Sequence, residues 1–399
     1  MQLLNKIQRP GAARHELAIV RSATTAFFAI DGFIFASWAV RIPAIKEQTA
    51  ASPAALGLAL LGLSGGAVAT MTISGALCRR FGSGRMMVAA AILLSGALLL
   101  PPLARSAPAL GLALFVFGIG YGGLNVAMNS LAVDLVAALR RPVMPSFHAA
   151  WSLGGLAGAG LGGLLAPHLS PLRHLALVAL LGFAVTAVCG RTVLVRRVPG
   201  AVDRRREDGD AQMQGAVAGT RVLVWRAVLL VGLIALCSAY GEGAIGDWGA
   251  LHLRQDLGAG AGLAAAGYAA FALAEACGRL AGSSLLERLG QTRVLVLGGL
   301  TACAGMLAAA LAPVVAVALA GFALTGLGVA NMFPAAMTRA GLLAGPHGVA
   351  TASTLGYAGF LLGPPAIGFL AGSVSLGVGL TTVSALALVA AALASVAGS

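Results

Sequence analysis

Apolar stretches of roughly 20 residues recur along nearly the whole chain, and they constrain its fold more than any other feature. A stretch of this length crosses the hydrocarbon core of a bilayer as a single helix. Hydrophobic residues make up 59% of the 399 residues and charged residues only 10%, whereas a soluble domain carries roughly 25% charged residues. The sequence therefore predicts an all-α integral membrane protein.

Twelve transmembrane helices are expected from these stretches. They cover residues 18–41, 54–77, 86–104, 109–133, 144–166, 174–192, 226–247, 261–285, 294–312, 314–337, 348–370 and 375–397. Lysine and arginine collect in the cytoplasmic loops of membrane proteins. With both termini inside, most of the 26 basic residues fall in inside loops, and the exceptions are Arg41, Lys46, Arg105, Arg173 and Arg254. We therefore expect both termini in the cytoplasm.

The stretch from Arg191 to Arg226 is too polar to be buried and contains eight arginines. Charge-rich segments with few large hydrophobic residues do not form a core of their own. We predict an N-terminal six-helix half over residues 1–192, a cytoplasmic basic linker over 193–225, and a C-terminal six-helix half over 226–399.

The two halves resemble each other at an offset of 208 residues. GALCRRFGSGR (75–85) aligns with SSLLERLGQTR (283–293), and the same offset pairs Gly118 with Gly326. Repeated halves related by an axis along the membrane normal place a solute site between them, near the middle of the bilayer. The sequence therefore predicts two pseudo-symmetric six-helix halves.

Asp31 lies near the middle of the first predicted helix, ten residues before Arg41 and thus about 15 Å away along the helix. An ionisable group at this depth costs about 2.5–3.5 kcal/mol to insert, so it usually faces a cavity or a partner. Three interpretations remain open: a proton-coupling carboxylate, a member of a static structural pair, or a misplaced span. Arg41 is a candidate for a gating or structural charge.

Four further charged residues lie on the seventh and eighth predicted helices. Glu242 and Asp247 are five positions apart, which in an α-helix separates them by about 140° around the axis, so we expect them on different faces. Glu242 is the second candidate for proton coupling, whereas Asp247 is expected to cap the periplasmic end or to pair with Arg41. Glu275 and Arg279 stand at i and i+4 and are expected to form an ion pair.

Three asparagines are candidates for substrate binding. Asn125 and Asn129 are four residues apart on the fourth predicted helix, hence on one face, and Asn331 is a comparable candidate in the other half. Amide side chains both donate and accept hydrogen bonds, which suits the hydroxyl groups of a polar solute. Hydrogen bonds between helices account for these residues equally well.

Three aromatic side chains complete the candidate substrate site. His148 and Trp151 stand at the start of the fifth predicted helix, and Trp38 lies one turn before Arg41. An imidazole can titrate near neutral pH, and an indole can stack on the face of a sugar. The alternatives are interfacial hydrogen bonding for His148 and wall or interface packing for Trp38.

No cofactor, metal ion or nucleic acid is expected. The six histidines and five cysteines show neither ligand spacing nor a CxxC pair. The basic residues are spread over short loops without the interleaved aromatic residues of a nucleic-acid surface. No cluster of a nucleophile, a base and an orienting group can be identified, so an enzyme is not expected.

The segment after the second predicted helix resembles the motif of the major facilitator superfamily, which runs roughly G-x-L-x-D-R-x-G-R-R/K. Gly75, Leu77, Arg80 and Gly82 match this motif, but Arg79 stands where the family has an aspartate. In the family, this acid and its basic neighbours help to stabilise one gated state. The resemblance implies gating or structural roles for the charges of the motif and of its second copy, which are Arg79, Arg80, Arg85, Glu287 and Arg288.

Four more segments resemble a bacterial inner-membrane branch of that superfamily, the YbjJ-like proteins. They are ASWAVRIPAIK (36–46), NVAMN (125–129), SFHAAWSLGG (146–155) and EGAIGDW (242–248). The resemblance covers nearly the whole chain, and the neighbours of this branch include proton-coupled sugar symporters of the fucose type. It implies a multi-pass transporter of the bacterial inner membrane.

The leading hypothesis is a secondary active transporter that moves a small polar solute, such as a sugar, by alternating access and is coupled to protons through Asp31 or Glu242. The expected partners are the lipid bilayer, a small-molecule substrate and protons, and the chain is expected to be monomeric. Two alternatives remain open. One is proton-driven efflux of amphipathic compounds, which the aromatic content of only 6% disfavours, and the other is a membrane sensor or scaffold that binds without transport.

Overall fold

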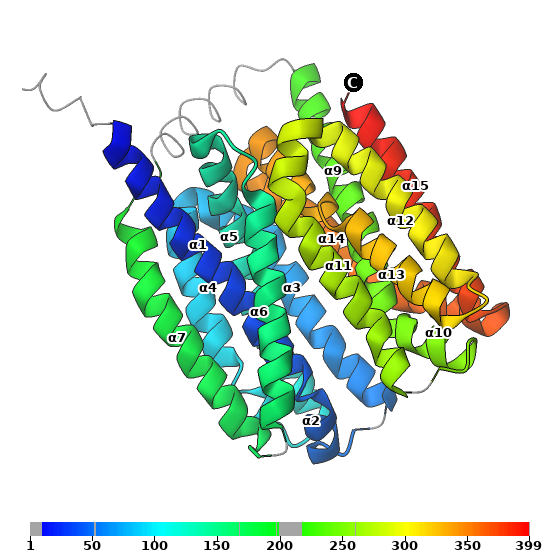
Figure 1. Cartoon of the computed structure of the whole chain (residues 1–399). Helices are drawn as coiled ribbons and strands as arrows, with labels where there is room; N and C mark the ends of the chain where they lie inside the picture. Colours follow the sequence, from blue (N-terminus) through cyan, green and yellow to red (C-terminus); the bar gives the residue numbers. More distant parts are fainter. Residues whose placement is uncertain are drawn as a thin grey trace, which may run out of the picture. The chain divides into compact units, whose positions relative to one another are not determined.

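Helices account for almost all of the structure, a computed structural model that describes residues 10–51, 53–166, 168–196, 198, 218–259 and 261–398. Within those ranges no β-strand occurs (Figure 1). The all-α class predicted from the apolar stretches is therefore confirmed.

The helices follow the apolar stretches closely. Up to residue 198 they are α1 (Pro10–Ala39), α2 (Ile42–Gln48), α3 (Pro53–Phe81), α4 (Ser83–Ala97), a 3-10 turn (Pro101–Leu103), α5 (Ala107–Leu139), α6 (Met144–Leu165) and α7 (Pro171–Val195). From residue 218 they are α9 (Ala218–Ala244), a π-helical turn (Ile245–Gly249), α10 (Ala250–Gln255), α11 (Ala261–Leu289), α12 (Gln291–Ala310), α13 (Val315–Val329), α14 (Met332–Ser373) and α15 (Leu376–Gly398).

The chain forms two compact units. Unit 1 consists of Met1–Thr70, Ala76–Val143 and Leu153–Gly215, and unit 2 consists of Met71–Gly75, Met144–Ser152 and Ala216–Ser399. The first turns of α6 therefore pack with unit 2. Most of the predicted linker, 193–225, falls outside the described residues, so the division into two six-helix halves around it stays a prediction.

In unit 1, glycines allow α5 to lie close to α3 and α4. A Cβ atom on Gly118 or Gly122 would collide with the α3 backbone at Leu63 or Ala67. On another face of α5, a Cβ atom on Gly120 would lie 2.7 Å from the backbone nitrogen of Leu94 in α4. Small residues at such positions let membrane helices pack backbone to backbone.

Unit 2 is built around pairs of neighbouring helices. Helix α9 packs against α14 and α15, α12 packs against α13 and α15, and α11 packs against α13. Phe271, Met306 and Phe322 are fully buried between these helices. Buried aromatic and sulfur-containing side chains fill the irregular space that alanine-rich helix faces leave open.

Two irregularities interrupt the last third of unit 2. The span expected over 314–337 is broken at Ala330 and Asn331, between α13 and α14. Helix α14 itself bends where Ala344 and Gly345 leave helical geometry, and Gly345 has a φ of 56°. Glycine adopts this left-handed conformation without the steric penalty that a Cβ atom brings.

Nine stretches of the described residues are long and apolar enough to cross a membrane. One of them, Val315–Ser373, contains both α13 and the bent α14. Helices α6 and α11 are not among the nine, and they are the helices that carry His148 and the Glu275–Arg279 pair. A multi-pass membrane protein is confirmed, whereas the count of twelve spans and the cytoplasmic position of both termini stay predictions.

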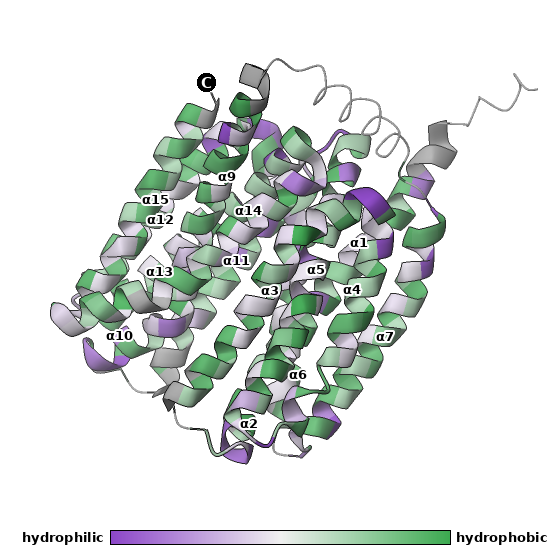
Figure 2. Cartoon of the chain, turned by 180° about the vertical axis from the view of Figure 1, so that it is seen from behind, coloured by the Kyte–Doolittle hydropathy of each residue, from purple (hydrophilic) through white to green (hydrophobic). Residues whose placement is uncertain are grey.

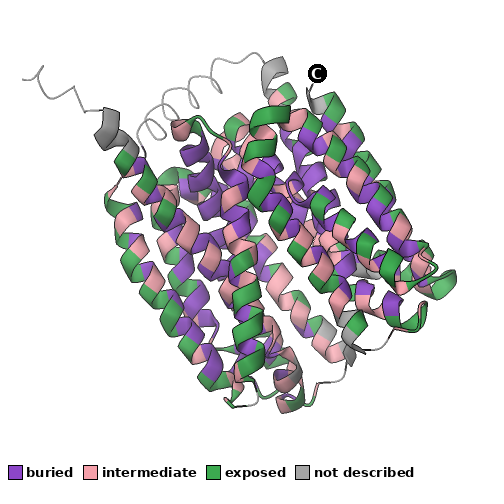
Figure 3. Ribbon diagram, in the orientation of Figure 1, coloured by how far each residue is buried: buried purple, intermediate pink, exposed green. Residues whose placement is uncertain are grey.

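Helix α7 shows how the surface of the molecule suits lipid. Leu177, Leu180 and Val188 of α7 are exposed, whereas His174 and Val178 are buried. Figure 2 shows the mostly hydrophobic colouring of the helices, and Figure 3 shows exposed residues along α7. An apolar exposed face on a long helix is what contact with acyl chains requires.

Candidate substrate and proton sites

Asp31 is fully buried in unit 1, on a segment of α1 that packs tightly against α6. A Cβ atom on Gly154 or Gly158 of α6 would collide with the backbone of α1 at Ala29 or Phe33, on either side of Asp31. The glycine face of α6 therefore fixes the depth and direction of the α1 segment that carries this carboxyl group.

Asn125 and Asn129 lie on the buried part of α5, with exposed fractions of 8% and 0%. The amide Nδ2 of Asn129 donates a hydrogen bond of 2.9 Å to the backbone oxygen of Asn125, one turn earlier. This bond occupies one of the two N–H groups of the Asn129 amide. The substrate roles of both side chains stay predictions.

Trp38 and Arg41, near the end of α1 and directly after it, are also buried in unit 1. The Trp38 ring lies 6.3 Å from the Phe117 ring of α5, measured between centroids. Nε of Arg41 donates a 2.8 Å hydrogen bond to Nδ1 of His174, and Nη1 donates a 3.3 Å hydrogen bond to the oxygen of Ala166. Arg41 thus holds the segment after α1 to the start of α7.

One buried acid of unit 1 is not among the sequence candidates. Asp134 lies on α5 with 6% of its surface exposed. The fourth predicted helix ends at residue 133, which places Asp134 just beyond it, whereas α5 continues to Leu139. An apolar stretch marks the membrane-embedded part of a helix and does not show where the helix itself ends.

In unit 2, the buried residues Glu275 and Arg279 and the half-buried Glu242 form one charged cluster. Nη2 of Arg279 donates a 2.6 Å hydrogen bond to Oε1 of Glu275 on the same helix, α11. The same nitrogen lies 3.8 Å from Oε2 of Glu242, which comes from α9. Arg279 and Glu275 are 4% exposed, so the structure contains the ion pair expected between them and adds a second carboxylate to it.

Three more polar groups approach Arg279 or the two acids. Nη1 of Arg279 donates a hydrogen bond to Oγ of Ser152 on α6, and its Nε donates one of 3.4 Å to the oxygen of Ala330. The Tyr268 hydroxyl lies within electrostatic range of both acids and of Arg279. Ser152 lies in the segment 146–155, but neither Ser152 nor Tyr268 is a site candidate from the sequence, and only their proximity to Arg279 identifies them.

Three candidates for substrate contact, His148, Trp151 and Asn331, also belong to unit 2. His148 lies on α6 within electrostatic range of Arg279, and its ring lies 5.7 Å from the Phe333 ring in an edge-on arrangement. Trp151, on the same helix, is half-buried. Asn331 directly precedes α14, and its Nδ2 donates a 3.0 Å hydrogen bond to the oxygen of Gly278 on α11.

Asp247 is exposed and belongs to the π-helical turn that follows α9. Hydrogen bonds in a π turn join residues five positions apart, so Glu242 and Asp247 are separated by a smaller angle than the α-helical geometry of the sequence prediction gives. The Tyr268 hydroxyl lies within electrostatic range of both acids. The prediction that Glu242 and Asp247 lie on different faces stays a prediction.

The charges of the superfamily motif lie at the surface of the molecule. Arg79, Arg80, Arg85, Glu287 and Arg288 are all exposed. The Arg80 guanidinium lies 5.3 Å from the centroid of the Phe81 ring, which is within the range of a cation–π contact. Their gating roles stay predictions.

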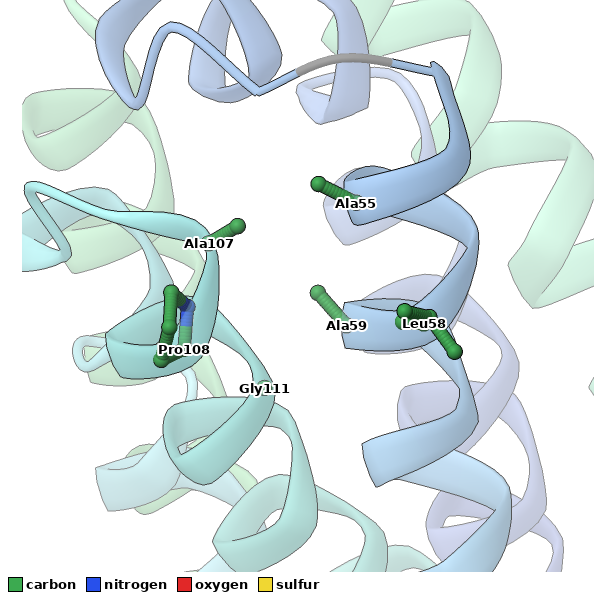
Figure 4. A pocket seen from close by; sticks show the side chains of 6 residues that line it. All are labelled: Ala55, Leu58, Ala59, Ala107, Pro108 and Gly111. Carbon is green, nitrogen blue, oxygen red and sulfur yellow. The ribbon is translucent and has the colours of Figure 1, made fainter.

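A small cavity of about 240 Å³ lies between the first turns of α3 and α5 (Figure 4). Its lining consists of Ala55, Leu58, Ala59, Ala107, Pro108 and Gly111. These side chains offer no polar group that could orient a solute, and specific small-molecule sites need a few such groups. The cavity is therefore not a candidate for the solute site.

Comparison with known proteins agrees with this architecture. The family model of the Major Facilitator Superfamily matches residues 23–246. The chain is 36% identical over 349 residues to the uncharacterized transporter y4wD of Sinorhizobium fredii, which covers 86% of this chain and 89% of the relative. It is 33% identical over 375 residues to an uncharacterized MFS-type transporter of Yersinia pestis, covering 93% of this chain and 94% of the relative.

Solved structures show the same fold. A crystal structure of the fucose:proton symporter of E. coli matches with a TM-score of 0.77 and 15% identity, over 94% of this chain and 98% of its own. The proton:xylose symporter XylE, bound to 6-bromo-6-deoxy-D-glucose, matches with a TM-score of 0.78 and 15% identity, over 95% of each chain.

Proposed function

Because the chain belongs to the major facilitator superfamily of transporters, we propose that it moves a small polar solute, such as a sugar, by alternating access and is coupled to protons. In this proposal Asp31 and Glu242 bind the coupling proton. Asn125, Asn129, Asn331, His148, Trp151 and Trp38 are the proposed substrate contacts.

The charged cluster of buried Glu275 and Arg279 with half-buried Glu242 is the observation that carries this proposal. Two carboxylates share one guanidinium, so the ionised cluster has one negative charge more than it can neutralise. Burial penalises uncompensated charge, and a proton is the simplest ion that can relieve it. The fold similarity to proton-coupled symporters for fucose and xylose supports protons as the coupling ion and sugars as the first substrates to test.

The setting of this activity is the bacterial inner membrane, where a proton gradient is available to drive uptake. The bacterial relatives support a bacterial membrane. In this proposal the chain crosses the bilayer twelve times, works as a monomer, and keeps both termini in the cytoplasm.

Flux measurements in proteoliposomes test the proposal. Purified protein is first screened for thermal stabilisation by L-fucose, D-xylose, sugar acids and amino acids, because a ligand that binds only the folded state raises its stability. The stabilising solute is then offered to vesicles that contain a pH-sensitive dye, with an acidic exterior. We expect solute accumulation together with internal acidification, and a protonophore should abolish the accumulation.

Two outcomes contradict the proposal in different ways. Solute flux that is equal with and without the pH gradient, and that causes no internal acidification, would exclude proton coupling but keep transport. Stabilisation by a solute without any flux would instead favour a sensor or scaffold.

A further inference from the structure

Arg279 contacts four different parts of unit 2 with one guanidinium group. It bonds to Glu275 on its own helix, lies 3.8 Å from Glu242 on α9, and donates hydrogen bonds to Ser152 on α6 and to the oxygen of Ala330. Only 4% of its surface is exposed. A guanidinium has five N–H donors in a rigid fork, so movement toward one partner alters its bonds to the others.

The contact with Ala330 is made at the break between α13 and α14. In a continuous helix the Ala330 oxygen would accept a hydrogen bond from the residue four positions later, which is Pro334. Proline has no N–H group, so this oxygen lacks its helical donor. Nε of Arg279, at 3.4 Å, supplies a donor in its place.

A second hydrogen bond runs in the opposite direction at the same break. Nδ2 of Asn331 donates to the oxygen of Gly278, which directly precedes Arg279. A Cβ atom on Gly278 would lie 2.7 Å from Cβ of Ala330, so the two segments approach very closely. Residues 278–279 and 330–331 thus bind each other reciprocally, and this clasp fixes the helix break to α11.

The charge on the neighbouring acids determines how strongly Arg279 is held. When Glu242 and Glu275 are both ionised they attract Nη2 together, and a proton on this pair reduces the attraction. The other titratable groups near the cluster are Tyr268 on α11, Asp247 on the π turn and His148 on α6. Among these five groups, only Glu242 and Glu275 lie within 4 Å of an Arg279 nitrogen as ion-pair partners.

We infer that Arg279 is a positioning residue that transmits the protonation state of the Glu242–Glu275 pair to the helix break at Ala330 and Asn331. Ionised acids hold Arg279 in place and keep the clasp closed. Proton binding weakens this hold, so the clasp opens more often. The inference deepens the proposed function, since it assumes that Glu242, which shares Arg279 with Glu275, binds the coupling proton, but its test requires no transport.

Amide hydrogen exchange of the full-length protein in detergent tests this inference. Exchange is followed in the segment 326–335 below and above neutral pH and is corrected for the intrinsic pH dependence of amide exchange. We expect faster corrected exchange on the acidic side. Glu275→Gln, which imitates the protonated acid, should raise exchange above neutral pH by roughly tenfold, the loss expected for one charge-assisted hydrogen bond.

Two further variants distinguish an effect of the Arg279 guanidinium geometry from a general effect of charge. Arg279→Lys keeps the positive charge but lacks the fork, so exchange in 326–335 should be fast on both sides of neutral pH. Asp247→Asn, the matched control, removes a nearby acid that makes no ion pair with Arg279, and its exchange should equal that of the unmodified protein.

Three results would overturn the inference. They are pH-independent exchange in the unmodified protein, unchanged exchange in Glu275→Gln, and exchange in Arg279→Lys that equals that of the unmodified protein at both pH values. The measurement on the unmodified protein decides by itself if a variant does not fold. Absence of proton-coupled flux would refute the proposed function and leave this result intact, whereas coupled flux with pH-independent exchange would refute only the role of Arg279.

Discussion

Nε of Arg41 donates a 2.8 Å hydrogen bond to Nδ1 of His174, and 2% and 1% of the two residues are exposed. A guanidinium can only donate, so Nδ1 of His174 accepts and carries no proton in this arrangement. Burial removes water from the Arg41 guanidinium, and a buried charge that loses its hydration needs hydrogen-bond partners in the protein. The imidazole therefore partly replaces the water that solvates this arginine.

His174→Ala should destabilise the protein by about 1.5–3 kcal/mol, because it leaves a buried cation without one of its acceptors. His174→Gln is the matched control: its side-chain oxygen can still accept from Arg41, so a smaller loss is expected. Thermal unfolding of both variants in the same detergent measures the difference. Equal stability of His174→Ala and the unmodified protein would show that the Arg41–His174 bond contributes nothing.

Glycines 154 and 160 lie on the same helix, α6, and differ in what surrounds them. A Cβ atom on Gly154 would collide with the α1 backbone at Ala29, whereas Gly160 has open space around it. We expect Gly154→Leu to cost about 1–3 kcal/mol through overpacking and to impair transport by displacing Asp31. Gly160→Leu should be close to neutral in both assays, and similar losses in the two variants would argue against the glycine face of α6 as the support for α1.

Asp31→Asn should separate coupling from substrate movement. An asparagine at this buried position carries no titratable proton, so gradient-driven accumulation in proteoliposomes should be lost while counterflow exchange continues. Glu47→Gln, which changes an exposed acid on α2 of the same unit, serves as the control and should accumulate solute normally. Unaltered accumulation by Asp31→Asn would remove this residue from the coupling role.

The predicted topology can be tested in cells with a reporter enzyme that is active only in the periplasm. Fused after Ser399, the reporter should be silent, because an even number of spans returns the chain to the cytoplasm. Fused near Arg105, in a loop predicted to face outward, it should be active. Activity at the C-terminus would contradict the predicted cytoplasmic position of that terminus.

Apolar length was enough to predict the helices, because the energetics of a bilayer demand a hydrogen-bonded helix wherever such a stretch crosses it. The same reasoning missed the break at Ala330 and Asn331, although Pro334 lay within the expected span 314–337 and signals a missing backbone hydrogen bond. The average composition of a stretch predicts that it lies in the lipid bilayer. It does not show where a single proline, which lacks an N–H group, interrupts the helix.

The candidate site was only partly predictable. Glu275 and Arg279 were expected to pair because i,i+4 neighbours meet on every α-helix. The bonds from Arg41 to His174 and from Arg279 to Ser152 join residues 133 and 127 positions apart. No periodicity relates such positions, and only the packing of distant helices brings them together. The substrate roles of the three asparagines, of His148 and of the tryptophans stay predictions.

The π turn at Ile245–Gly249 shows how one residue can determine the direction of a side chain. A π turn holds about one residue more than an α turn, and each residue of an α-helix adds about 100° of rotation. Deletion of a single residue within this turn would convert it to an α turn and change the directions of the side chains in the turn, those of Asp247 and Trp248 included. The direction of the Asp247 side chain therefore depends on the number of residues in this turn. A relative that lacks one residue here could lose this direction while its overall sequence identity stays almost unchanged.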